Sequence, residues 1–149
     1  MDMGEAKTLT QFERDVLDRI LRGDDPVIEA LRRQLAAASV SGRQFTGVGF
    51  YTDFVVPDDV PRVHNVDESL GTESDFEVGD VGAIFEDANV EVGFILFVRR
   101  GRITFLEGYT YGDDTWPERE GKYRLFYFGE LGTQSGGGEA KGDEGLPSN

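Results

Sequence analysis

Apolar residues among the first forty positions recur at the three- and four-residue spacing of amphipathic helices. Thr10 and Glu13 match a capping box, in which each side chain accepts a hydrogen bond from a free amide of the first helical turn. Gly23 is a helix-stop residue. A first helix is therefore predicted between Thr10 and Gly23. Its apolar stripe contains Phe12, Val16, Leu17, Ile20 and Leu21.

A second helix is predicted to begin at Asp25, which is a good N-cap, with Pro26 at the first helical position. Gly42 is the next helix-stop residue. Because the connection between the two helices is very short, an antiparallel hairpin of helices is expected.

Beyond residue 45 the apolar positions change from the period of a helix to that of a strand. Every aromatic residue except Phe12 lies between residues 45 and 128, and aromatic residues are enriched in strands. Gly79 and Asp80 indicate a bulge. Short connections favour antiparallel neighbours and a meander. About five strands are predicted, namely Phe45–Val56, Phe76–Phe85, Val92–Arg99, Ile103–Tyr109 and Tyr123–Glu130.

The predicted fold is α+β, with an N-terminal helical hairpin packed on a curved, mainly antiparallel sheet of about five strands. The strands are apolar on both faces: Phe94 and Leu96 alternate with Ile95 and Phe97. A sheet with one solvated face should alternate apolar and polar residues. Two helices cover one face, so the second face is expected to curl on itself, accept a long loop, bind a ligand or pair with a second copy.

The last residues differ in composition from the rest. Residues 132–149 contain six glycines and almost no apolar side chain, which cannot offset the entropy of ordering. We expect one domain over residues 1–131, followed by a disordered, Gly-rich acidic tail over residues 132–149.

The net charge is −14, and residues 44–90 contribute −10 of it. A field of this sign repels nucleic acids and attracts a basic partner or a cation, although it also serves solubility. The chain has no Cys, which excludes disulfides, thiolate metal sites and a Cys nucleophile. Its start does not resemble a signal peptide, and its longest apolar run, Val92–Val98, is too short for a bilayer. A cytoplasmic protein without membrane contact is expected.

Catalytic candidates are few. The single His64 excludes zinc sites that need two histidines, and no metal or cofactor is expected. Glu107 is predicted to share a strand face with Ile103, Phe105 and Tyr109. Burial of that face would favour the protonated form of the Glu107 carboxyl, which would suit Glu107 to acid–base catalysis. His64 could be its partner if the loop that carries His64 folds over the sheet. The alternative is a structural Glu tied to an Arg or a Tyr hydroxyl.

Two loops are candidates for binding. The stretch from residue 57 to residue 75 has no periodicity, and a loop of that length is functional or disordered. It is predicted to be a mobile loop, an acidic docking surface or a cation site. The loop of residues 112–118 carries the only Trp, which would serve as a binding anchor or as a lid packed against the sheet edge. The candidate binding residues are Asp58, Asp59, Asp67, Glu68 and Trp116.

Two segments, Phe45–Phe54 and Gly93–Gly112, followed by Trp116-Pro117-Glu118, resemble a family of small uncharacterised bacterial proteins. The resemblance implies a bacterial origin and transfers no catalytic residue.

We expect a non-enzymatic protein that binds another protein, which would be basic, through its acidic middle or its second sheet face. A homodimer through that face is a further option. The alternative is a small-molecule-binding protein or an enzyme with a pocket in the concave sheet that uses Glu107.

Overall fold

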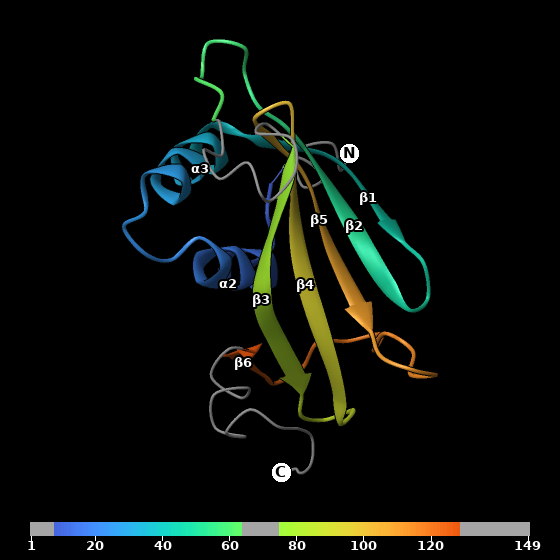
Figure 1. The fold of residues 1–149 in the computed structure, drawn as a ribbon. Helices are drawn as coiled ribbons and strands as arrows, with labels where there is room; N and C mark the ends of the chain where they lie inside the picture. Colours follow the sequence, from blue (N-terminus) through green and yellow to red (C-terminus); the bar gives the residue numbers. More distant parts are fainter. Residues whose placement is uncertain (1–7, 64–74, 129–149) are drawn as a thin grey trace.

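A computed structural model describes residues 8–63 and 75–128 and shows an α+β fold, in which two helices precede an antiparallel sheet of six strands (Figure 1). The fold class is as predicted, with one strand more than expected. The elements are α2 (Gln11–Ile20), α3 (Pro26–Ala37), β1 (Ser39–Phe45), β2 (Gly49–Val55), β3 (Phe76–Phe85), β4 (Val90–Arg99), β5 (Arg102–Thr110) and β6 (Tyr123–Tyr127).

Both predicted helix starts are confirmed. The Thr10 hydroxyl accepts a hydrogen bond from the amide of Glu13 at 3.1 Å, and the Glu13 carboxylate accepts one from the amide of Thr10 at 2.8 Å. The Asp25 carboxylate accepts from the amide of Val27 at 2.8 Å, with Pro26 next to it. These contacts satisfy amides that have no partner within the helix.

The predicted end of α3 near Gly42 is wrong, because the chain becomes extended at Ala38 and forms β1. This strand pairs antiparallel with β2, and Val40 is its one buried apolar residue. Small and polar residues such as Ser39 and Gly42 give no strand periodicity. The segment is held in an extended conformation by its pairing with β2.

The strand order is β1-β2-β5-β4-β3-β6. The predicted meander holds only for β3, β4 and β5, because β2 pairs with β5 and β6 pairs with β3. The predicted bulge at Gly79 and Asp80 is confirmed by a register shift between Val78 and Val81.

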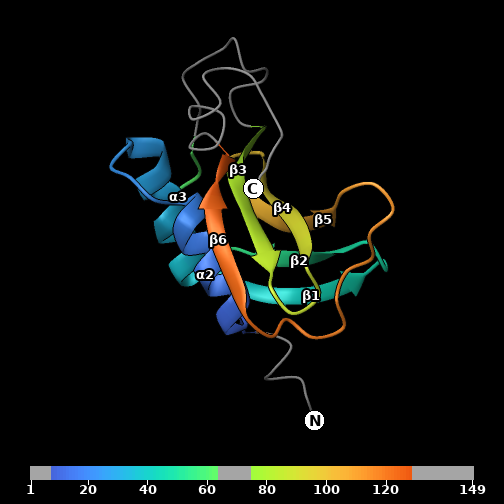
Figure 2. The same cartoon turned by 90° about the horizontal axis from the view of Figure 1, so that it is seen from below.

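The sheet curves around the two helices, which lie together on one of its faces (Figure 2). We call this the inner face and the opposite one the outer face. The inner face and the helices form the hydrophobic core. Its fully buried side chains include Val16, Leu17, Leu31, Val81, Phe85, Val92, Phe94, Leu96 and Leu106.

The two-residue turn between β4 and β5 offers a stabilising substitution. Arg100 and Gly101 both have positive φ angles, 54° and 77°, which is the geometry that favours Asn-Gly. Arg100→Asn is therefore expected to raise the free energy of unfolding by about 0.5–1 kcal/mol. Urea denaturation measures the gain. Arg100→Ala keeps the unfavourable φ and should match the wild type, and an Asn variant no better than Ala would contradict the prediction.

Candidate functional site

The outer face of the sheet carries large aromatic side chains that no helix covers in the described part of the chain. They belong to residues that alternate along the strands with core residues, and each is half-buried. The prediction that both faces of the strands are rich in apolar side chains is confirmed in β4 and β6. The outer aromatic face consists of the rings of Tyr51, Phe97, Phe105, Tyr109, Phe126 and Phe128, together with the aliphatic side chain of Ile95.

Three rings form a ladder across neighbouring strands. Phe97 on β4 stacks on Phe105 on β5 with ring centroids 4.4 Å apart and planes inclined by 22°. Phe105 meets Tyr51 on β2 edge-on at 5.7 Å. The guanidinium of Arg99 lies 5.1 Å from the centroid of Phe97, within the range of a cation–π contact. The ladder is therefore a continuous aromatic surface that already accepts one cation.

Beside the ladder, two glycines allow rings to lie against the backbone. A Cβ at Gly93 would come within 2.5 Å of the Tyr109 hydroxyl and 2.9 Å of that of Tyr111. A Cβ at Gly82 would come within 2.7 Å of the Phe126 ring. Gly93 and Gly82 are paired across β4 and β3. A side chain at either position would displace the rings, so these glycines shape the outer face.

Glu107 lies within the outer aromatic face. It is half-buried and stands opposite Tyr51 on one side and Ile95 on the other. The hydroxyl of Tyr51 donates to Oε2 of Glu107 at 3.3 Å. The negative charge of Glu107, followed by burial and this hydrogen bond, raises the pKa of Tyr51. The Tyr hydroxyl expected as a structural partner of Glu107 is thus present.

The predicted neighbours of Glu107 are correct for Phe105 and Tyr109 and wrong for Ile103. Thr104 is an extra residue in β5, since Phe97 pairs with Phe105 while Val98 pairs with Ile103. The bulge turns Ile103 inward, where it is 2% exposed. Glu107 itself lies on the outer face, whereas the concave inner face is filled by the core.

The acidic stretch is described only in part. Asp58 and Asp59 lie in an exposed turn after β2, where Arg102 donates to the carbonyl oxygen of Asp58 at 3.0 Å. His64, Asp67 and Glu68 lie outside the described residues. Within residues 8–63 and 75–128, no three His, Asp or Glu side chains converge for a metal ion. No helix in the same residues is long and apolar enough to cross a membrane.

Trp116 packs against the inner side of the fold. Its ring is half-buried, and its amide donates to the carbonyl oxygen of Gly47 at 2.9 Å. The loop between β5 and β6 thus closes one end of the core, which is the arrangement expected of a lid. Ring centroids of Phe12, Phe50, Phe85 and Phe94 lie 5.1–6.5 Å from that of Trp116.

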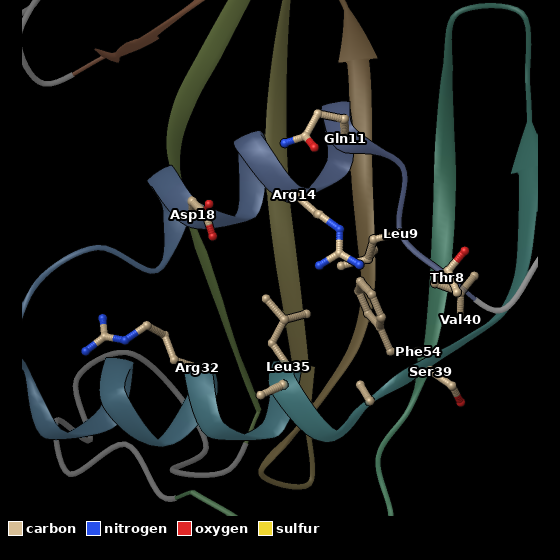
Figure 3. A pocket seen from close by; sticks show the side chains of 12 residues that line it. Thr8, Leu9, Gln11, Arg14, Asp18, Arg32, Leu35, Ser39, Val40 and Phe54 are labelled. Atoms are coloured by element: carbon tan, nitrogen blue, oxygen red, sulfur yellow. The ribbon is translucent and has the colours of Figure 1, made fainter. Parts of the chain in front are cut away.

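A groove of about 410 Å³ runs between α2, α3 and β1 (Figure 3). Its apolar floor includes Leu35 and Phe54, and Arg14, Asp18 and Arg32 lie along it. Arg32 donates to the carbonyl oxygens of Leu21 and Gly23, just after the end of α2, at 2.6 and 2.8 Å, so its guanidinium caps that helix. Arg14 and Asp18 carry opposite charges. The charged side chains along the groove are therefore of mixed sign.

The sequence placed Phe97 on the second sheet face and Phe105 beside Glu107, but neither of them, nor Tyr51, was predicted to be a binding residue. The alternation of β4 and β5 contains the signal for Phe97 and Phe105. Tyr51 joins them only through the pairing of β2 with β5, which the predicted meander did not include.

Comparison of the chain with protein-family models, with curated proteins and with solved structures finds no match. The resemblance to a bacterial family stays a prediction.

Proposed function

We propose that this protein is a non-enzymatic binding module that takes up a basic protein partner on its outer aromatic face. The observation that carries the proposal is the continuous ring ladder of Phe97, Phe105 and Tyr51, which no helix covers in residues 8–63 and 75–128. Aromatic side chains supply large contact area and are enriched at protein interfaces.

Charge favours a basic partner over a second copy. Asp53 and Glu77 are exposed on the same face and lie beside the rings. Of the basic residues there, Arg99 lies on Phe97, Arg102 donates to the carbonyl oxygens of Asp58 and Val60, and Arg124 is 3.7 Å from a carboxylate oxygen of Glu86. Two copies would bring like charges together, which costs energy, whereas a basic surface is attracted and steered to the face.

The setting of this activity is part of the proposal. The net charge of −14 favours solubility and attracts basic partners. We place the protein in the bacterial cytoplasm, as expected from the sequence.

The test compares capture of proteins from a bacterial lysate by the full chain and by two variants. The double variant Tyr51→Ala with Phe105→Ala removes the ladder, and Phe45→Ala removes an equally large ring that is 71% exposed on β1. We expect a basic protein to be captured by the wild type and by Phe45→Ala. Purified and titrated, it should bind the double variant at least about tenfold more weakly.

Thermal unfolding of both variants verifies that they remain folded. A captured protein that binds the double variant as tightly as the wild type would overturn the proposal. Sedimentation that shows a dimer of the wild type and a monomer of the double variant would assign the face to a second copy instead.

A further inference from the structure

We infer that Glu107 binds an arginine side chain of the partner. The guanidinium would lie between the carboxylate and the neighbouring rings. This inference rests on the proposed function and adds to it the chemistry of the central contact. The side chains around Glu107 are Tyr51 and Ile95 across the strands and Phe105 and Tyr109 along its own strand.

Glu107 is a half-buried carboxylate without a cation in the described part of the chain. Ion pairs there join Glu13 to Arg43 and Glu86 to Arg124, and neither of them involves Glu107. The hydrogen bond to Glu107 comes from the neutral Tyr51 hydroxyl and reaches Oε2. A carboxylate among apolar rings loses solvation, and a cation that arrives with a partner would restore it.

A guanidinium suits this place better than an ammonium group. It is planar, donates two parallel hydrogen bonds to a carboxylate and stacks on aromatic faces. The outer face already shows this behaviour, because Arg99 lies over Phe97 at 5.1 Å. The ladder continues from Phe97 through Phe105 to Tyr51, so a second guanidinium at Glu107 would find the same kind of surface.

The experiment titrates the full chain with the capped peptide Gly-Arg-Gly-Arg-Gly while amide resonances are recorded by NMR. Two matched peptides carry citrulline, which has the shape of arginine without its charge, or lysine. We expect the arginine peptide to shift the amide signals of Tyr51, Ile95 and Glu107. The lysine peptide should bind several-fold more weakly, and the citrulline peptide should cause no such shift.

The variant Glu107→Gln should weaken the arginine peptide about tenfold, which corresponds to one charge-assisted hydrogen-bond pair. Glu77→Gln removes an exposed charge from the same face and should change the affinity less than about twofold, by long-range attraction only. Equal affinity for the arginine, lysine and citrulline peptides, or unchanged affinity in Glu107→Gln, would overturn the inference.

The arginine site at Glu107 and the proposed function can be tested separately. A purified partner that requires Tyr51 and Phe105 but binds Glu107→Gln as tightly as the wild type would overturn the arginine site alone. A partner that binds the Tyr51→Ala, Phe105→Ala double variant as tightly as the wild type would overturn the proposed function.

Discussion

Replacing Glu13 with alanine is expected to lower the free energy of unfolding by about 3 kcal/mol. The Glu13 side chain is 5% exposed and accepts hydrogen bonds from Arg43 at 2.7 and 2.8 Å. The Thr52 hydroxyl on β2 donates to it at 2.6 Å. Alanine would leave Arg43 and Thr52 without their partner at the contact between α2 and the first two strands.

The effect of Glu13 should depend on pH. Burial by itself would raise the pKa of Glu13, but the hydrogen bonds from Arg43, Thr52 and Thr10, with the charge of Arg43, outweigh burial and lower it below the usual 4.5. A lowered pKa means that this contribution is fully present above pH 4.5 and is lost as the pH falls through the pKa of the folded state.

Urea denaturation of the wild type and of Glu13→Gln from pH 7 to pH 3 measures this contribution. The difference between the two should be largest near neutral pH and shrink as the solution becomes acidic. Glu86→Gln is the control, since its ion pair with Arg124 is exposed and such pairs contribute little. A difference that stays constant over this range would contradict the assignment.

Replacing Phe12 with alanine is expected to cost about 3–5 kcal/mol, the usual loss for a large aromatic side chain in a core. Phe12 is 4% exposed and joins α2 to β3, β4, β6 and the loop between β5 and β6. Because most domains have only about 5–15 kcal/mol of stability, this variant is expected to be close to unfolding. Its ring centroid lies 4.9–6.5 Å from those of Phe85, Phe94, Trp116 and Tyr123.

Denaturation followed by the fluorescence of Trp116 reports this loss, because Trp116 packs against Phe12. Phe12→Leu keeps much of the volume and should lose less, which provides a measurable variant if the alanine form does not fold. Phe45→Ala makes the same chemical change at an exposed ring and should alter stability little. Equal losses for Phe12→Ala and Phe45→Ala would show that the core is not centred on Phe12.

The stability of the fold and the proposed binding depend on opposite faces of the sheet. Glu13 and Phe12 lie at the inner face, so their variants test how α2 is held on the sheet. Tyr51, Phe105 and Glu107 variants test what the sheet presents on its other side. A variant of the outer face that lost binding together with most of its stability would not report on an interface.

Much of the local structure could be predicted because it depends on residues close together in the chain. Thr10 with Glu13, and Asp25 with Pro26, mark the helix starts through contacts within one turn. The strand β1 could not be predicted from Ser39–Phe45, since one buried residue gives no period and the ladder with β2 provides the hydrogen bonds.

Only part of the candidate site could be predicted from the sequence. Alternation along β4 placed Ile95 and Phe97 on a second apolar face. Alternation along β5 placed Phe105 beside Glu107, but it placed Ile103 there as well. The bulge at Thr104 reverses that assignment, and a bulge depends on pairing with β4 rather than on the residues of β5 alone.

The sequence by itself determined the helix starts, the α+β class and a sheet that is apolar on both faces, because capping and side-chain alternation act over a few residues. Only the tertiary structure decided which face the helices cover, that Trp116 closes the core and that Glu107 stands among rings on the other side. Those outcomes depend on strand order and register, which are set by contacts between residues far apart in the chain.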